Sequence, residues 1–315
     1  MIAEHSRVLV TGASGLIGAA VVRLLRERGN IVVACDDFSL GMSRLEEDGI
    51  VWEQVDVSEA GFSDRFSKYE PSAVIHCAAH PGGLSLEAPA TNVRVNALGS
   101  MQVFEWCAKQ KIPVIYLSSS AVYGEQPPGP IPETAALRPS TIYAVCKVTC
   151  ESFLRVLEAG YGLPWTVLRL FATYGAGHRP NAYQGIVNVV LTQLLAGNAL
   201  TVKGSLDRVR DLLYVEDAAR AIVGCLSNPN ARGHVFNVGT GVGVTVRELI
   251  ATLCEVLGRR VSDVTITEAA ATVGDPLSSV ADATALEAAI GFVPRFALRD
   301  GLVSLVQARL AGSRP

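Results

Sequence analysis

Two side chains one helical turn apart, Tyr143 and Lys147, form the pair in this 315-residue chain best suited to acid–base chemistry. Residues at i and i+4 share one face of a helix, so the Lys147 ammonium is expected beside the Tyr143 phenol. A nearby cation stabilises the phenolate, which makes the tyrosine a general base that takes a proton from an alcohol while a hydride leaves the same carbon. The alternative is a Tyr–Lys pair on a solvated helix face.

Three consecutive serines precede this pair, at the point where an apolar run ends. The run at 113–117 is typical of a buried strand, and Ser118, Ser119 and Ser120 follow it directly. A serine at the end of a strand can hydrogen-bond the substrate oxygen that Tyr143 deprotonates. The order strand, serine, tyrosine and lysine is the one that a single site requires.

Glycines spaced G-x-x-G-x-x-G end an earlier apolar run. That run covers 7–11, the glycines are Gly12, Gly15 and Gly18, and a helical pattern follows at once. Free N–H groups and the positive end of a helix suit a pyrophosphate, and glycine lets the turn close and the backbone approach the phosphates. With a strand before it and a helix after it, the motif predicts a dinucleotide site in preference to an ordinary glycine-rich turn.

Asp36 closes the next apolar run, 31–35. A carboxylate at the end of the second strand accepts hydrogen bonds from both ribose hydroxyls of an adenosine and repels a 2′-phosphate. Because no Arg or Lys stands between 36 and 39, the sequence predicts NAD as the cofactor in preference to NADP. The adjacent Asp37 is either a second cofactor contact or a solvated loop carboxylate.

The composition indicates an enzyme that acts on a small molecule. The formal net charge is −3 and there is no block of basic residues, which argues against nucleic acid or a membrane as a partner. No apolar run reaches the roughly 18 residues of a membrane span, and the first residues do not resemble a signal peptide. The seven cysteines include no CxxC pair, so we expect reduced thiols in a cytoplasmic protein and no metal site.

Apolar β-branched runs alternate with helical patterns along the chain. The runs lie near 7–11, 31–35, 50–55, 73–79, 113–117, 164–171 and 234–239. The helical patterns lie near 16–28, 91–110, 142–159, 185–197, 215–227, 245–257 and 282–290. This alternation predicts an α/β fold, a Rossmann-type doubly wound parallel sheet with a smaller C-terminal substrate-binding lobe.

The shorter and less regular elements after about 172 set the expected domain boundaries. We expect 1–171, with 209–240 returning to it, to form the NAD-binding Rossmann domain. The substrate-binding lobe is expected at 172–208 and 241–315. Such a lobe covers the carboxyl ends of the strands, where ligands of these sheets bind.

Together the motifs resemble the extended short-chain dehydrogenase/reductases, and more narrowly the NAD-dependent sugar-nucleotide epimerase/dehydratase family. The likeness runs nearly end to end and rests on Gly12, Gly15, Gly18, Asp36, Ala78, Ala79, Asn96, 118–124, Tyr143, Lys147, 169–171, 210–217, 236–241 and 274–276. The resemblance implies that Tyr143 is the catalytic base. Lys147 would hold the cofactor ribose and tune the tyrosine, and Ser119 would be the catalytic serine.

The resemblance also implies two sets of binding residues. The expected cofactor contacts are Gly12, Gly15, Leu16, Ile17, Gly18, Asp36, Asp37, Asp56, Val57, Ala78, Ala79, His80, Asn96, Tyr143, Lys147 and Phe171. The expected substrate contacts are Ser119, Ser120, Tyr143 and Arg210. His80 is expected to be an ordinary loop histidine with respect to catalysis.

The residues after the catalytic serine narrow the reaction that the resemblance implies. The 4,6-dehydratases of this family carry Asp-Glu directly after the catalytic threonine, where this chain has Ser120 and Ala121. Without a carboxylate there, elimination lacks its acid/base, and an epimerase acting on a nucleotide-activated sugar through a transient 4-keto intermediate is favoured. The alternatives are an NAD-dependent dehydrogenase or reductase of a related sugar or smaller alcohol, and a non-catalytic dinucleotide-binding protein.

Two positions depart from the family pattern for holding a nucleotide diphosphate. Ala172 stands where the family usually has Asn, and Thr272 where it usually has Arg. Arg210 is the anchor that remains, with Arg179 or Arg208 as possible substitutes. The alternative for Arg210 is a structural ion pair with one of three nearby carboxylates, those of Asp211, Glu216 and Asp217.

Members of the family often form homodimers by pairing two helices across a two-fold axis. The corresponding helices are expected at about 92–110 and 142–159. We therefore expect a homodimer in which the apolar residues of these helices serve both the core and such a seam; the alternative is that they pack in the core alone. The residues in question are Val103, Phe104, Val148, Phe153 and Leu154.

Overall fold

The larger part of the fold is a seven-stranded, all-parallel sheet, as the alternating sequence pattern predicts. The computed structural model describes residues 5–40, 44–45, 47–177, 185–197 and 199–312. The sheet has the strand order β11-β7-β5-β4-β1-β2-β3. Its strands are β1 (Arg7–Thr11), β2 (Ile31–Asp36), β3 (Ile50–Gln54), β4 (Ala73–His76), β5 (Val114–Ser119), β7 (Trp165–Leu170) and β11 (His234–Val238).

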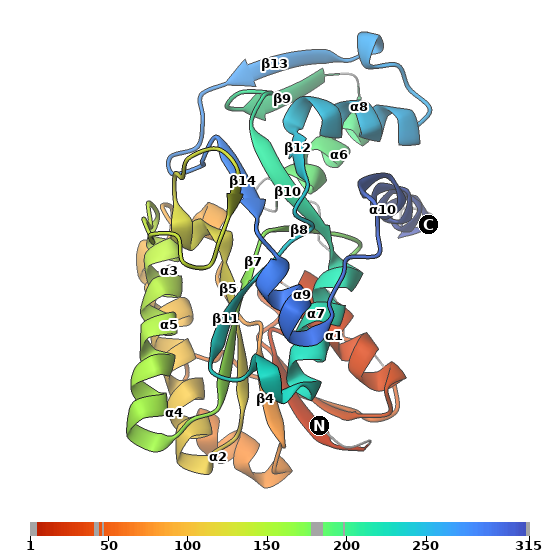
Figure 1. The fold of residues 1–315 in the computed structure, drawn as a ribbon. Helices are drawn as coiled ribbons and strands as arrows, with labels where there is room; N and C mark the ends of the chain where they lie inside the picture. The colour runs from red at the N-terminus through yellow and green to blue at the C-terminus, as the bar shows by residue number, and fades with distance from the viewer. Residues whose placement is uncertain (1–4, 41–43, 46, 178–184, 198, 313–315) are drawn as a thin grey trace.

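Helices cover both faces of this sheet (Figure 1). One face carries α1 (Leu16–Glu27), α7 (Val215–Ser227) and α9 (Thr284–Ile290). The other carries α2 (Phe62–Phe66), α3 (Pro89–Val93), a π-helical segment η3 (Arg94–Gly99), α4 (Ser100–Gln110) and α5 (Ile142–Tyr161). A parallel sheet buried on both sides explains why the strands are almost continuously apolar.

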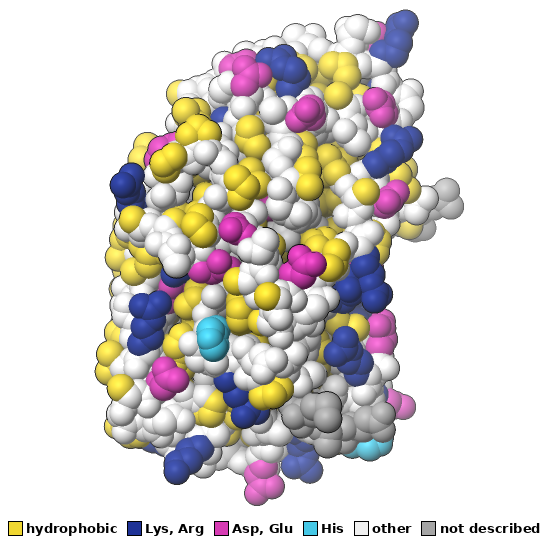
Figure 2. All heavy atoms as spheres, in the orientation of Figure 1, with side chains coloured by type: hydrophobic (Ala, Val, Ile, Leu, Met, Phe, Trp, Pro, Cys, Tyr) yellow, Lys and Arg dark blue, Asp and Glu magenta, His cyan; other side chains and the backbone are white. Residues whose placement is uncertain are grey.

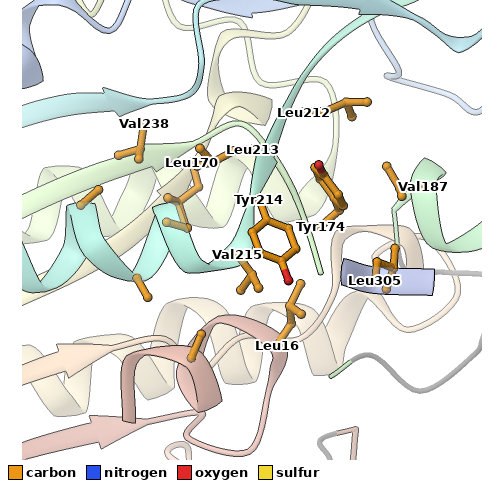
Figure 3. Packing of buried hydrophobic residues seen from close by; sticks show 14 of the residues in the cluster. Leu16, Leu170, Tyr174, Val187, Leu212, Leu213, Tyr214, Val215, Val238 and Leu305 are labelled. Carbon is orange, nitrogen blue, oxygen red and sulfur yellow. The ribbon is translucent and has the colours of Figure 1, made fainter. Parts of the chain in front are cut away.

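The alternation of side chains along the strands divides the core into two layers. In β1, Val8 and Val10 belong to the cluster under α1 and α7, whereas Leu9 belongs to the cluster under α4 and α5. All three side chains are fully buried. Figure 3 shows the first of these clusters, in which Leu16 and Val215 lie near each other.

A smaller part of the structure lies beyond the carboxyl ends of the strands (Figure 1). It contains a sheet ordered β12-β10-β14-β6, with β8 pairing to β10, and a separate parallel pair, β13-β9. These strands are β6 (Pro130–Ile131), β8 (Ala172–Tyr174), β9 (Ala199–Lys203), β10 (Val209–Tyr214), β12 (Gly243–Thr245), β13 (Thr265–Ala269) and β14 (Ser278–Ala281). The helices of this part are α6 (Ile186–Ala196), α8 (Val246–Val256) and α10 (Leu298–Gly312).

The helix expected at 91–110 is divided by the π-helical segment 94–99. There the Asn96 carbonyl accepts hydrogen bonds from Ser100 Oγ at 2.7 Å and from Cys150 Sγ at 3.0 Å. These side-chain donors satisfy a carbonyl within the widened turn, so the backbone can depart from α-helical geometry. None of the helices in the described part of the chain is long and apolar enough to cross a membrane.

Candidate active site

A cleft of about 570 Å³ opens at the carboxyl ends of the parallel strands. Its walls come from the turns that follow five of them: Gly12 after β1, Asp36 at the end of β2, Ala78 after β4, Ser119 at the end of β5 and Phe171 after β7. The cleft therefore lies where open α/β sheets bind ligands.

The glycine turn forms the floor of the cleft, and its backbone leaves no room for side chains. Gly12 adopts φ +64°, and a Cβ there would lie 2.6 Å from the Ala78 backbone nitrogen. A Cβ on Gly18 would meet the backbone of Gly12 and Ala13. The start of α1 thus faces the cleft directly, through Gly15 and the residues after it, and presents the positive end of a helix to a bound anion.

Asp36 is held rigidly at one end of the cleft. Only 8% of the residue is exposed. Its Oδ2 accepts a hydrogen bond from Ser14 N at 2.9 Å, and its Oδ1 accepts one from Phe38 N at 2.8 Å. A carboxylate has about four acceptor positions, so two remain for the hydroxyls of a ribose. The neighbouring Asp37 also lines the cleft, but it is exposed and bonded to Ser39.

Asp56 and Val57 line the same end, together with an arginine that sequence reasoning missed. Arg94 donates to Asp56 Oδ2 at 2.7 Å. Burial alone would raise the pKa of the Asp56 carboxyl, but hydrogen bonds from Ser58 and Arg94 outweigh it and hold that pKa below its usual range. No motif marks Arg94, because its partner lies 38 positions away in the sequence.

Ser119, Tyr143 and Lys147 converge on the other end of the cleft. Lys147 is 3% exposed, and its Nζ donates to the Leu117 carbonyl at 2.7 Å. The same Nζ lies 5.5 Å from the centre of the Tyr143 ring. Thr141 Oγ1 accepts from Ala144 N at 3.1 Å and caps α5, so Tyr143 lies in the first turn of the helix.

The loop after β4 packs against Tyr143. A Cβ on Gly82 would lie 3.1 Å from Tyr143 Cδ1, so a larger residue at this position would crowd the tyrosine ring. Asn96 holds the loop: its Oδ1 accepts from His80 N at 2.7 Å, and its Nδ2 donates to His80 O at 2.9 Å. Burial and the nearby Arg94 charge lower the pKa of His80.

Most of the expected cofactor contacts line this cleft. The lining includes Gly12, Gly15, Leu16, Ile17, Gly18, Asp36, Asp37, Asp56, Val57, Ala78, Ala79, His80, Tyr143, Lys147 and Phe171. Asn96 is fully buried and does not line it, because its amide is engaged with the His80 backbone. Of the expected substrate contacts, Ser119 and Tyr143 line the cleft, whereas Ser120 and Arg210 do not.

Arg210 instead lies in a cluster of two arginines and one carboxylate. Its Nη2 donates to Asp275 Oδ1 at 2.5 Å and to Pro276 O at 2.7 Å, and Arg208 pairs with the other oxygen of Asp275. Burial and the charge of Arg208 lower the pKa of Arg210 to about 10. An ion pair is therefore present, with a partner 65 positions away that sequence reasoning did not consider.

Two of the other carboxylates weighed as partners of Arg210 have contacts of their own. Asp211 accepts from Thr240 and Gly241, and Asp217 pairs with Arg220. Arg179 lies outside the described residues. Among the residues that are described, no group of three or more His, Cys, Asp or Glu side chains is arranged to hold a metal ion.

Comparison with known proteins gives a family match over most of the chain. The model of the NAD dependent epimerase/dehydratase family matches residues 8–239. The UDP-glucose 4-epimerase of Mycolicibacterium smegmatis is 29% identical over 309 residues, which cover 96% of this chain and 97% of that protein.

Solved structures agree with this match. The UDP-glucose 4-epimerase of Thermotoga maritima, solved with UDP-glucose, superposes with a TM-score of 0.92 at 30% identity, covering 98% of this chain and 100% of that one. The UDP-glucose 4-epimerase of Thermus thermophilus, in complex with NAD, gives a TM-score of 0.90 at 31% identity, with the same coverage.

Proposed function

The chain belongs to the NAD-dependent epimerase/dehydratase family, and we propose that it is an NAD-dependent epimerase that inverts C4 of a UDP-sugar through a transient 4-keto intermediate. The similar enzymes of known structure include one solved with UDP-glucose and one with NAD. The cleft fits NAD, because it is lined by the glycine turn with the start of α1, which suits a pyrophosphate, and by the Asp36 carboxylate, which suits a ribose.

Tyr143 and Lys147 perform the acid–base part of this reaction. The glycine turn and Asp36 would hold NAD, which would supply the hydride acceptor for the oxidation at C4. Tyr143, as the phenolate, takes the proton of the 4-hydroxyl, and the Lys147 ammonium stabilises that phenolate. Ser119 donates a hydrogen bond to the same sugar oxygen. When the keto sugar presents its opposite face, the hydride would return to C4 on that face and Tyr143 returns the proton to the oxygen, so the net reaction is an inversion at C4 with no net change in NAD.

The observation that favours epimerisation is the distribution of carboxylates around the cleft. Among the described residues that line it, the carboxylates are Asp36, Asp37 and Asp56. All three lie at the end expected to hold the adenosine. Elimination of the 6-hydroxyl requires an acid/base beside the sugar, and the residues after Ser119 supply none because the chain continues with Ser120 and Ala121.

Arg210 is the proposed anchor for the diphosphate of the substrate. Arg208 and Arg210 together carry two positive charges, whereas their shared partner Asp275 carries one negative charge. One positive charge is therefore left without a carboxylate. Arg–phosphate contacts are strong charge-assisted hydrogen bonds, so a diphosphate can compete with the carboxylate for these two guanidinium groups.

The test is NMR of UDP-glucose incubated with the enzyme and NAD. We expect UDP-galactose to appear until the two sugars reach equilibrium, with no net increase in NADH absorbance. Tyr143→Phe is expected to lower the rate at least about 10²-fold while leaving the fold intact. Accumulation of NADH in step with sugar oxidation, or a dehydrated sugar as product, would contradict the proposal.

We further propose that the protein is a cytoplasmic homodimer that pairs through α5 and the segment before α4. Exposed apolar side chains on these elements support the pairing: Leu98 is 60% exposed, Val145 49% and Val156 69%. Of the apolar residues considered from the sequence, Val103, Phe104 and Leu154 are buried in the core of the subunit. Val148 and Phe153 are partly buried and pack against that core. Light scattering at micromolar concentration is expected to give twice the subunit mass.

We propose that neither nucleic acid nor an anionic membrane is a partner of this protein. Figure 2 shows Lys and Arg side chains interspersed with Asp and Glu over the face that it draws. The seven cysteines are all unpaired, which supports the assignment to a reducing compartment such as the cytoplasm.

A further inference from the structure

A buried ion pair lies directly behind the catalytic serine, between α5 and the sheet. Glu151 and Arg169 are each 2% exposed. Arg169 Nη2 donates to Glu151 Oε2 at 2.6 Å, and Arg169 Nε donates to Glu151 Oε1 at 3.0 Å. The contact is bidentate, the geometry that fixes a carboxylate most firmly. The mechanism above uses neither residue.

The carboxylate of this pair also holds the strand that carries Ser119. Ser118 Oγ donates to Glu151 Oε1 at 2.6 Å. Ser118 and Arg169 are register partners on β5 and β7, and Glu151 reaches both from α5. Because side chains alternate along a strand, the Ser118 hydroxyl points to the α5 side and its neighbour Ser119 is fixed with it.

The same helix face therefore contacts two consecutive residues before the catalytic serine. Tyr143, Lys147 and Glu151 are spaced four residues apart on α5. Lys147 Nζ donates to the Leu117 carbonyl, and Glu151 accepts from the Ser118 hydroxyl. Side chains at i, i+4 and i+8 line one face of a helix, so the base, its cation and the carboxylate form one row.

Arg169 extends the contact to the segment after Ser119. Its Nη1 donates to Tyr123 Oη at 2.9 Å, and that hydroxyl donates to Asn237 Oδ1 at 2.6 Å. Tyr123 lies in the short 3-10 helix η4 (Ser120–Tyr123), which follows Ser119 directly. Ser119 thus lies in the chain between Ser118, which is bonded to Glu151, and Tyr123, which is bonded to Arg169.

Stability alone does not account for an ion pair at this position. Removing two charges from water is costly, and well-packed apolar residues in place of a buried pair are often neutral or stabilising. Burial tends to lower the pKa of Arg169, but its hydrogen bonds and attraction to Glu151 outweigh that effect and raise it. The guanidinium therefore stays charged inside the core.

We infer that Glu151 is a positioning residue of the active site: paired with Arg169, it fixes the end of β5 against α5 and so sets the Ser119 hydroxyl and the Lys147 ammonium relative to Tyr143. The substrate-based part of its test rests on the proposed epimerase function. A second measurement needs no sugar, so it tests the positioning role of Glu151 even if the proposed epimerase function is wrong.

Ser118→Ala is the mildest perturbation, because it removes the link to β5 and leaves the ion pair in place. We expect kcat to fall about 5–10-fold, since small misplacements of reacting groups have large rate effects. The KM for the UDP-sugar, the affinity for NAD and the melting temperature should change little. The matched control is Thr166→Val, which removes a buried hydroxyl bonded to Ala231 O at 2.9 Å on the neighbouring strand, away from the cleft. It should leave kcat unchanged.

The double variant Glu151→Met/Arg169→Met tests the pair itself. If the pair positions the site, the folded double variant loses kcat by about 10-fold or more, and the acid limb of its pH profile moves upward. A movement of the Lys147 ammonium away from Tyr143 weakens its attraction for the phenolate, which is why the limb is expected to move upward. A folded double variant with the wild-type kcat and pH profile would overturn the inference.

The measurement without sugar is ultraviolet titration of the phenolate absorbance that Tyr143→Phe removes, in the NAD complex. We expect its midpoint to move upward in Ser118→Ala and not in Thr166→Val. An unchanged midpoint together with an unchanged kcat would overturn the positioning role, even if the double variant does not fold. If the wild type turns over no UDP-sugar, the proposed function fails and this titration alone decides the inference.

Discussion

Replacing Asp36 should change the cofactor preference of the enzyme more than any other single substitution. The carboxylate is 8% exposed, and each of its oxygens already accepts one backbone N–H. The carboxylate lines the cleft, and its two remaining acceptor positions suit the 2′- and 3′-hydroxyls of the adenosine ribose. Hydrogen bonds to a charged group contribute about 1.5–3 kcal/mol each. Loss of the pair in Asp36→Ala should therefore raise the Kd for NAD about 10²-fold or more.

The effect on NADP should have the opposite sign. A phosphate placed about 5 Å from the carboxylate meets a repulsion of roughly 3 kcal/mol per charge pair at an effective dielectric constant near 20. Removing the carboxylate relieves this repulsion and offsets the lost ribose contact. The preference for NAD over NADP should thus fall by at least about two orders of magnitude. Fluorescence titration of the dinucleotide-free protein with both cofactors measures the ratio.

Two further variants make this measurement decisive. Asp37→Ala removes the adjacent, exposed carboxylate, which is bonded to Ser39, and should change the Kd for NAD less than about threefold. Asp36→Asn removes the charge but keeps one acceptor oxygen, which can still bond Ser14 N of the glycine turn, so comparing its melting temperature with that of Asp36→Ala separates loss of local structure from lost recognition. The reasoning is refuted if the NAD-to-NADP ratio is unchanged in Asp36→Ala, or if Asp37→Ala has the larger effect.

Further predictions follow from the same geometry. Lys147→Ala should lower kcat, weaken NAD binding and move the pH optimum upward; pH–rate profiles with NAD titration check this. Arg210→Ala should raise the KM for a UDP-sugar strongly and leave NAD affinity unchanged, and a large fall in melting temperature without a KM defect would assign Arg210 to a structural ion pair. Ala172→Asn combined with Thr272→Arg should lower that KM. Burial lowers the pKa of His76 from 6.5 to about 3, so its neutral form is favoured in the folded state. The unfolded chain therefore binds the extra proton as pH falls below 6.5, and the free energy of unfolding, measured by urea titration, should decrease by about 2 kcal/mol between pH 6.5 and pH 5.

The features predictable from the sequence are those fixed by local geometry. The glycine turn, the strand that ends at Asp36 and the i, i+4 pair of Tyr143 and Lys147 each depend on neighbouring residues, and the seven-stranded sheet follows from repeated strand–helix units. The order of strands in that sheet brings these motifs to one edge without any further signal in the sequence.

The features that could not be predicted depend on contacts between distant segments. Asp275 lies 65 positions from Arg210, and its pairing requires β10 and β14 to be neighbours. Strands as short as β6, with two residues, carry too little periodicity to be recognised. No sequence signal distinguishes Glu151 from any other glutamate on a helix. Its contacts with Ser118 and Arg169 could not be predicted, because they depend on the register between β5 and β7.

The most direct test of the central claim is the fate of the hydrogen at C4 during turnover. A UDP-sugar carrying deuterium at C4 should keep that deuterium in the inverted product, and an unlabelled sugar turned over in deuterium oxide should gain none at C4. This result is expected because the hydride that leaves C4 returns to the same carbon while Tyr143 moves only the hydroxyl proton. Loss of the label, or entry of solvent deuterium at C4, would contradict the transient 4-keto mechanism.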